Sequence, residues 1–264
     1  MTKPPILDGK HYASPSAFEA ENLLREARRQ NDIAPGDIPE ICLLDPDGDM
    51  VRALTASGRA TRDEFWACYH TDMHRFTHDD IEFGIIGCAV GASFAVLLAE
   101  QMFASGCRLL ISVTSSGKIT PVRPPPYFVL IDRALRDEGV SYHYLPPSEF
   151  SHADPDLMAA MEHAFDGLAE PVERGATWTT DAPYRETNEA IGLAREKGLL
   201  AVEMEAAGLY AFAEARGCDV ICFAHVTNQM AQIDGDFEKG EAGGAHDALD
   251  LAAACARSWR AHNP

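Results

Sequence analysis

Two carboxylates, Glu203 and Glu205, stand where an apolar run gives way to an alanine-rich segment. The apolar residues 199–202 favour a strand, and residues two apart in an extended segment share a face. We therefore expect both acids to point into one pocket at the carboxyl end of a strand, where open α/β sheets bind ligands. A carboxylate in that position accepts hydrogen bonds from vicinal hydroxyls such as those of a ribose. The spacing alone equally allows that the acids only begin a helix, whose dipole favours negative charge.

Three blocks of sequence carry a resemblance to a known family. The central block, residues 202–210, reads VEMEAAGLY, and the block before it, residues 178–184, reads WTTDAPY. The apolar run 220–226 follows, with Thr227 and Asn228 at its end. Together the blocks resemble the nucleoside phosphorylase family, which holds purine nucleoside phosphorylases, uridine phosphorylases and related nucleosidases. The likeness is good from about residue 109 to the C-terminus and extends to residue 41, as in a divergent member.

The resemblance implies a role for each of several residues. Met204 and Glu205 would contact the ribose, and Glu203 would line the same pocket. Tyr184, with Trp178, would pack against the base, because an aromatic face stacks on a flat heterocycle. The catalytic residues would be Asn228 and Glu205. The substrate-binding residues would be Glu203, Met204, Glu205, Tyr184, Trp178, Asp181, Ser115 and Gly117.

Asn228 would act on the base during bond cleavage. The transition state of glycosidic cleavage carries an oxocarbenium-like sugar, and negative charge moves onto the departing base. A hydrogen-bond donor at the base edge stabilises that charge as it develops. The amide offers both a donor and an acceptor, which suits a 6-oxopurine, but it cannot release a proton as the aspartate of hexameric family members does. The alternative is that Asn228 only forms a turn after a strand.

The sequence departs from the family at the segments that hold phosphate. The family has a glycine and an arginine in the loop after the first strand, where this chain has Leu44 and Gly48. A second family arginine is replaced by Ser112. Ser115, beside Gly117, keeps a hydroxyl that suits phosphate. The loss of two guanidiniums removes the charge-assisted bonds that bind a dianion.

This departure leaves the attacking nucleophile open. Phosphate is the co-substrate that the family implies, with no other cofactor and no metal. Asp45, Asp47 and Asp49 would repel it, although Arg52, Lys118, Arg123 or a neighbouring subunit's arginine would supply a cation. One alternative is a nucleoside hydrolase in which an acid such as Asp47 positions water. The other alternative is a nucleoside-binding protein without activity.

The elements that must position these residues alternate along the chain. Apolar runs predict strands at residues 41–44, 83–86, 109–114, 127–131, 176–180, 199–202 and 220–226. Helical patterns cover residues 18–30, 93–104, 155–170, 188–197, 205–216 and 245–260. The alternation predicts one domain, residues 1–264, with an α/β/α three-layer fold. The family implies a central mixed, partly barrelled sheet. Two segments rich in proline or glycine, 121–126 and 235–244, predict loops, the second of them a lid or rim.

The composition limits the partners. The formal net charge is −19 over 264 residues, which disfavours nucleic acid and anionic membranes. No apolar run is long enough to span a bilayer, and residues 1–10 contain no secretory signal. The seven cysteines include no CxxC pair, as is typical of reduced thiols in a cytoplasmic protein. The family implies a homo-oligomer, as a dimer, trimer or hexamer, that acts on a small nucleoside.

Two further patterns have less specific meaning. His70, His74 and His78 recur every four residues, but on a helix the outer two would lie about 12 Å apart, too far for one metal ion. We expect a structural or solvated face there. Glycines in residues 83–93 predict a turn between a strand and a helix. Such a turn either packs the two closely or presents backbone N–H groups to an anion.

Overall fold

The computed structural model describes residues 4–228, 239 and 241–263. Its ten-stranded sheet runs β10-β6-β8-β9-β5-β1-β4-β3-β2, with β7 beside β6. The strands are β1 (Ile41–Asp45), β2 (Ala60–Arg62), β3 (His74–His78), β4 (Ile81–Gly87), β5 (Leu109–Lys118), β6 (Tyr127–Asp137), β7 (Phe150–His152), β8 (Val172–Thr180), β9 (Ala201–Glu203) and β10 (Asp219–Asn228). The helices are α1 (Ala20–Asn31), α2 (Asp49–Ala56), α3 (Ala92–Phe103), α4 (Ser141–Tyr144), α5 (Pro155–Ala160), α6 (Asn188–Glu196), α7 (Ala206–Arg216) and α8 (Ala245–His262).

The sheet is mixed and closes on itself at one end. Strand β10 pairs with β6 on one side and with β5 on the other, so that β5, β10, β6, β8 and β9 form a ring. Strand β1 runs parallel to both β4 and β5, and β10 also runs parallel to β5. Strand β9 is antiparallel to β5. The predicted mixed, partly barrelled sheet is confirmed.

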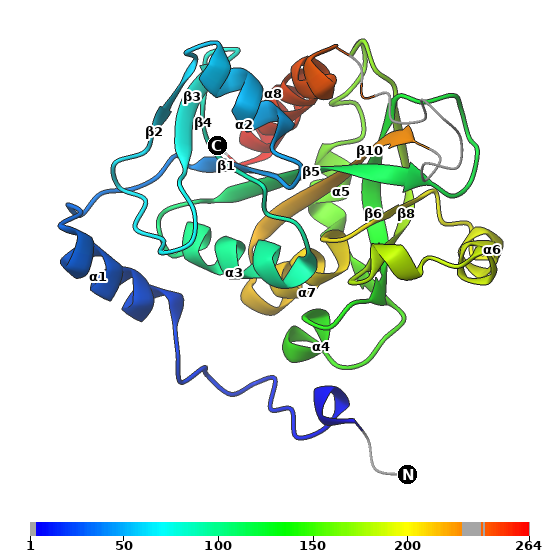
Figure 1. The fold of residues 1–264 in the computed structure, drawn as a ribbon, viewed down its shortest axis with the longest axis horizontal. Coiled ribbons are helices and arrows are strands. Elements are labelled where there is room, and N and C mark those ends of the chain that lie inside the picture. The colour runs from blue at the N-terminus through cyan, green and yellow to red at the C-terminus, as the bar shows by residue number, and fades with distance from the viewer. Residues whose placement is uncertain (1–3, 229–238, 240, 264) are drawn as a thin grey trace.

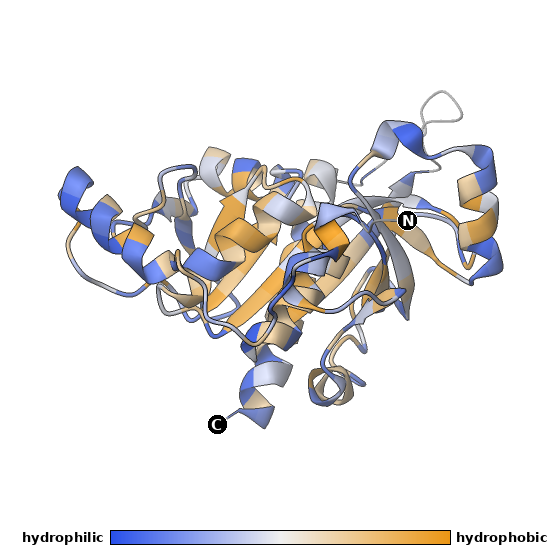
Figure 2. Cartoon of the chain, turned by 90° about the horizontal axis from the view of Figure 1, so that it is seen from below, coloured by the Kyte–Doolittle hydropathy of each residue, from blue (hydrophilic) through white to orange (hydrophobic). Residues whose placement is uncertain are grey.

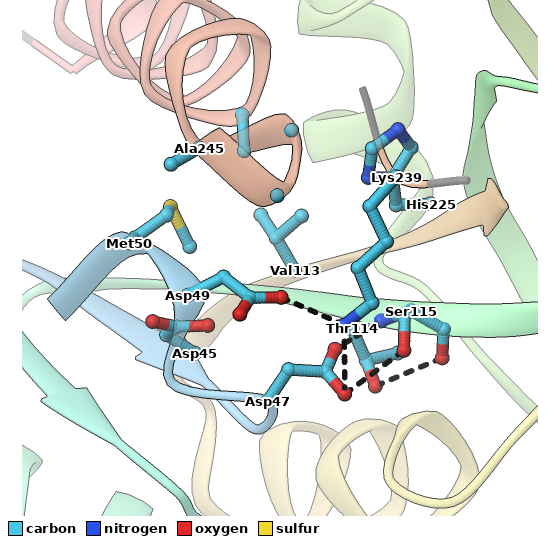
Figure 3. Close-up of a pocket in the computed structure, with 13 residues that line it drawn as sticks. Asp45, Asp47, Asp49, Met50, Val113, Thr114, Ser115, His225, Lys239 and Ala245 are labelled. Atoms are coloured by element: carbon cyan, nitrogen blue, oxygen red, sulfur yellow. Dashed lines mark hydrogen bonds and ion pairs between the residues drawn. The ribbon is translucent and has the colours of Figure 1, made fainter. Parts of the chain in front are cut away.

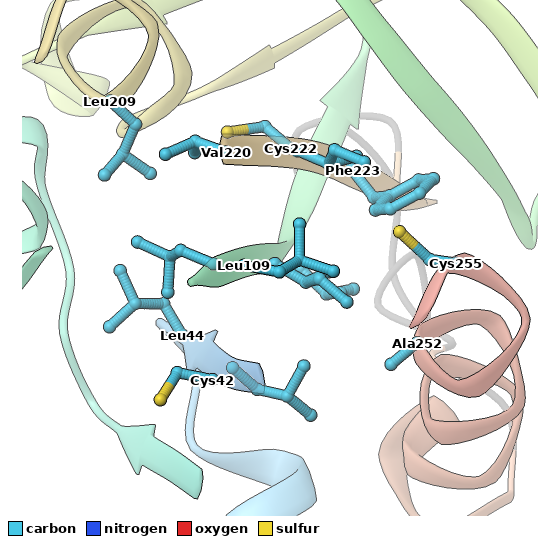
Figure 4. Packing of buried hydrophobic residues seen from close by; sticks show 14 of the residues in the cluster. Cys42, Leu44, Leu109, Leu209, Val220, Cys222, Phe223, Ala252 and Cys255 are labelled. Carbon is cyan, nitrogen blue, oxygen red and sulfur yellow. The ribbon is translucent and has the colours of Figure 1, made fainter. Parts of the chain in front are cut away.

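Helices cover both faces of the strands, which explains why these strands read as continuous apolar runs. Figure 1 shows α2 and α8 on one side of β1 and β5, and α3 and α7 on the other. All five residues of β1 are buried. In Figure 4, Leu209 of α7 faces the strands from one side, and Ala252 and Cys255 of α8 face them from the other. The three predicted layers are thus present.

Colouring by hydropathy separates the interior from the surface. In Figure 2 the central strands are the most hydrophobic part of the chain, and the polar turns of the helices lie outside them. Leu43, Ile111 and Ile221 lie side by side on β1, β5 and β10 and are fully buried. Each buried side chain of this size contributes about 1.5–3 kcal/mol to the free energy of folding.

Most predicted elements are confirmed, but several differ. The helix predicted at residues 155–170 ends at Ala160, and residues 161–167 continue as turns, with a positive φ at Gly167. The sequence analysis did not predict α2, α4, β2, β3 or β7. The histidine series is not helical, since His74 and His78 lie on β3 and His70 precedes it. Among the described residues, no group of His, Cys, Asp or Glu is placed to hold a metal ion.

The predicted loops have different outcomes. Residues 121–126 form the loop between β5 and β6, as expected. Of the predicted lid or rim at residues 235–244, only Lys239 and residues 241–244 lie within the described part of the chain. No helix that the structure describes is long and apolar enough to cross a membrane.

Candidate active site

Glu203 closes the junction between β9 and α7. Its Oε2 accepts hydrogen bonds from the backbone N–H groups of Glu205 and Ala206, both at 2.7 Å. Its Oε1 accepts from the hydroxyls of Thr179 at 2.5 Å and Thr177 at 3.1 Å. The carboxylate therefore caps the first turn of α7, as the alternative of a helix-starting acid proposed.

Glu205 is the second acid of the pair, and it is 1% exposed. Its Oε1 accepts from the N–H of Gly91 at 2.7 Å, and its Oε2 accepts from that of Met204 at 3.3 Å. Burial, and then the charge of Glu203, raise the pKa of Glu205 to about 8. The site therefore holds an acid that binds a proton near neutral pH.

The glycine turn after β4 supplies one wall of this pocket. Gly91 has a φ of +93°, a conformation that L side chains rarely adopt. No atom lies within 4 Å of where its Cβ would be, so close packing does not require a glycine there. Its N–H points instead to the Glu205 carboxyl group. The Gly91 N–H is thus bonded to a carboxyl group of the protein, and binding of an external anion by this turn stays a prediction.

The ends of three strands bring the remaining polar residues to the same edge of the sheet. Gly117 on β5 pairs with Asn228 on β10 and with Val202 on β9, next to Glu203. Asn228 is buried, and its Nδ2 donates to the Thr227 hydroxyl at 3.2 Å and to the carbonyl of Ser116 at 3.4 Å. Glu205, the predicted sugar residue, and Asn228, the predicted base residue, therefore lie at the same edge of the ring formed by β5, β10, β6, β8 and β9.

The loop after β1 meets β5 through a carboxylate (Figure 3). Asp47 Oδ2 accepts from the backbone N–H of Ser115 at 2.7 Å, and its Oδ1 accepts from the Ser115 hydroxyl at 2.9 Å. The ammonium group of Lys239 lies 2.7 Å from Asp49 Oδ2 and 3.5 Å from Asp47 Oδ1. The donors of Ser115 that were expected to hold phosphate are therefore bonded to a side chain of the protein itself.

Asp45 supports this loop from beneath. Its carboxyl group accepts from the N–H groups of Gly48 and Val51, both at 3.0 Å, and so holds the start of α2. Burial raises the pKa of Asp45 to about 6, although these two bonds oppose the shift. Asp45 thus has a structural explanation that does not require a ligand.

The cations considered in place of the family arginines are mostly engaged elsewhere. Arg52 donates to Asp49 Oδ1 at 2.6 Å and to the carbonyl of Asp47 at 2.7 Å. Arg123 pairs with Glu173 at 2.5 Å. Lys118 ends β5 opposite Ala201. The sequence analysis missed Lys239, which lies 190 residues from Asp49 and stands out by no local pattern.

The predicted base-site residues are spread over a larger region. Trp178 is buried on β8, and its indole N–H donates to Asp137 Oδ2 at 3.0 Å. Asp181 accepts from the N–H of Gly139 at 2.8 Å. Tyr184 lies in a short 3-10 helix, Pro183–Arg185, and its side chain is 99% exposed. The single chain does not bring Tyr184 to Glu205 and Asn228, and its packing against a base stays a prediction.

Comparison with known proteins assigns the chain to a family. A family model described as "Phosphorylase superfamily" matches residues 40–257. A DeoD-type purine nucleoside phosphorylase of Caldanaerobacter subterraneus is 28% identical over 206 residues, which are 74% of this chain and 85% of that protein. A uridine phosphorylase of Thermococcus kodakarensis is 26% identical over 234 residues, 81% of this chain and 84% of that one.

A solved structure extends the agreement to the fold. The crystal structure of a uridine phosphorylase from Vibrio fischeri superimposes with a TM-score of 0.69 at 18% identity, and covers 86% of this chain and 94% of the other. The match of the family model to most of the chain carries the assignment. This chain belongs to the phosphorylase superfamily, as a divergent member at low identity to its relatives.

Proposed function

We propose that the protein is an enzyme that cleaves the N-glycosidic bond of a nucleoside, with a purine as the base. The observation that carries the proposal is the buried Glu205 carboxyl group, positioned by the N–H groups of Gly91 and Met204 and adjacent to the strand end that bears Asn228. Buried carboxyl groups are costly unless bonded, and they occur most often where function requires them.

Glu205 is the residue that we assign to the ribose. A carboxyl group accepts a hydrogen bond when ionised and also donates one when protonated. Because its pKa is raised to about 8, Glu205 can do both with two adjacent hydroxyls near neutral pH. Glu203 acts indirectly in this proposal, since its four bonds hold the backbone of Glu205 and Ala206 in place.

Asn228 is the residue that we assign to the base. Its amide donates to the charge that develops on the leaving group, and an effect of this kind lowers barriers by a few kcal/mol. An amide that donates and accepts suits a 6-oxopurine, and this supports the choice of a purine. The relatives are named both as purine nucleoside and as uridine phosphorylases, so the choice of a purine rests on the Asn228 amide.

Phosphate is the co-substrate that the resemblance predicts, but it is not part of this proposal, because the chain lacks the two arginines with which the family holds it. A homo-oligomer and a cytoplasmic location likewise stay predictions of the resemblance. None of these features is needed for the assignment of Glu205 and Asn228, which concerns the sugar and the base alone.

Release of free base from nucleosides tests the proposal directly. The purified full chain is incubated with inosine, guanosine, adenosine and uridine, with phosphate present, and the bases are separated by chromatography. We expect cleavage of at least one purine nucleoside, and a large loss of activity in Glu205→Gln. Binding of nucleosides without any cleavage would favour the silent binding protein instead.

A further inference from the structure

The strongest unexplained contact in the site is the one between Asp47 and Ser115. Its two bonds, of 2.7 Å and 2.9 Å, use both the backbone N–H and the hydroxyl of Ser115. These are the groups that would otherwise bind an oxyanion, since a carboxylate and a phosphate accept from the same donors. The Asp47 carboxylate thus occupies the position in which a bound oxyanion would accept these two hydrogen bonds.

The charges around this contact oppose a second anion. Asp45, Asp47 and Asp49 all line the adjoining cavity, whereas its described lining includes one lysine, Lys239, and no arginine. Lys239 is already paired with Asp49, and Arg52 is bonded to the same aspartate. A phosphate dianion would have to displace Asp47 and remain beside the other carboxylates.

The same contact lies next to the proposed sugar site. On β5, Ser115 lies two residues before Gly117, the residue that pairs with Asn228 and with β9. The adjoining cavity has a volume of about 20 Å³, enough for one water molecule. Two donors from Ser115 satisfy part of the roughly four acceptor positions of a carboxylate, which leaves capacity for a water.

We infer, on the basis of the proposed function, that water rather than phosphate attacks the sugar in this protein, with Asp47 as its general base. The water oxygen bonds to C1′ as the C1′–N bond breaks, and that electron pair leaves with the base. The Asp47 carboxylate takes the proton from the attacking water and later returns it to solvent. The departing base takes one proton from solvent, so that nucleoside and water give free sugar and free base.

The requirement for phosphate is the first test. The wild-type enzyme is assayed with a cleaved purine nucleoside, with and without phosphate, and the sugar product is identified. We expect the same rate in both cases and free ribose as the product. A rate that depends on phosphate, with ribose 1-phosphate as the product, would overturn this inference and leave the proposed function intact. The absence of cleavage of any nucleoside under either condition would overturn both.

Asp47→Asn tests the role of the carboxylate. The amide keeps the size of the side chain but cannot take up a proton, so we expect kcat to fall roughly 10²–10⁴-fold with little change in KM. The matched control is Asp79→Asn, because Asp79 is an exposed aspartate that pairs with Arg257 outside the site. Its activity should equal that of the wild type. A loss of less than about tenfold in Asp47→Asn would contradict the inference.

Phosphate binding supplies a readout without activity. Inorganic phosphate should leave the Tm of the wild-type protein unchanged, because Asp47 already holds the donors of Ser115. In Asp47→Ala these donors are released, and phosphate should raise the Tm by mass action. A rise in the wild type as large as in the variant would show that Asp47 does not exclude the anion.

Discussion

The two halves of the site are built by different means. In the half assigned to sugar and base, Glu203, Glu205 and Asn228 are buried and bonded to backbone groups or threonine hydroxyls. In the other half, Asp47 and Asp49 meet Lys239 through ion pairs, and the side chain of Asp47 is 30% exposed. The first half depends on desolvated hydrogen bonds, and the second depends on charges that solvent screens.

This difference offers a physical reason for the inferred change of nucleophile in a site that keeps its sugar and base residues. Buried polar groups with several bonds are costly to alter, because each loss leaves another group without a partner. A part-exposed loop with ion pairs tolerates substitution more easily. By the resemblance, the chain keeps the family's two acids at the end of β9 and differs from the family in the loop after β1. The difference therefore lies in the half in which substitution costs less free energy.

Glu203→Ala tests the hydrogen-bonded half most severely. It would leave the hydroxyls of Thr177 and Thr179 and two backbone N–H groups buried without an acceptor. We expect a loss of about 4 kcal/mol in the free energy of unfolding, measured by urea denaturation. Glu196→Ala, at the end of α6, serves as the surface control and should change stability by less than about 0.5 kcal/mol. If Glu203→Ala changed stability as little as Glu196→Ala, the sugar and base half would not depend on its buried hydrogen bonds.

Asn228→Ala tests the base side of the same half. The loss of a donor to the developing negative charge should lower kcat about 10²-fold, or roughly 2.7 kcal/mol, with a smaller change in KM. Asn228→Asp is the informative companion, because it supplies the acid found in hexameric family members. Full activity in Asn228→Ala would show that the amide has no part in the reaction.

The pH dependence of stability tests the burial of Glu205. The folded protein keeps this proton up to about pH 8, whereas the unfolded chain releases it above pH 4.5. The folded state therefore binds more protons in this interval, and the wild type should lose stability as pH rises from 4.5 to 8. In Glu205→Gln the stability should fall less steeply with pH than in the wild type, in denaturation experiments across that range. Parallel curves for the two proteins would contradict a raised pKa.

Lys239→Gln tests the ionic half and should have the smallest effect. Its ammonium group is part-exposed and pairs with Asp49 and Asp47, so we expect a loss of about 0.5–1 kcal/mol at low salt. Added salt should narrow the difference from the wild type, because screening weakens such pairs. A loss of stability as large as that of Glu203→Ala, and unaffected by salt, would show that the two halves depend on the same kind of interaction.

Much of the fold was predictable because its signals are local. Continuous apolar runs predicted β1, β5 and β10, since these strands are covered on both faces and need apolar residues at every position. Short or half-exposed elements such as β2 and β3 carry little pattern, and they were missed. The helix predicted to residue 170 ends ten residues early, at Ala160, and no local signal in the sequence marks that end.

The sequence by itself determined the family, through the block of residues 202–210 and the two blocks that flank it. It also determined that two acids follow a strand and that the family arginines are absent. Only the tertiary structure decided that Glu203 caps α7 while Glu205 meets Gly91, and that Asp47 bonds Ser115. These contacts join residues up to 114 positions apart, because strand register and helix placement, rather than local sequence, set which groups meet.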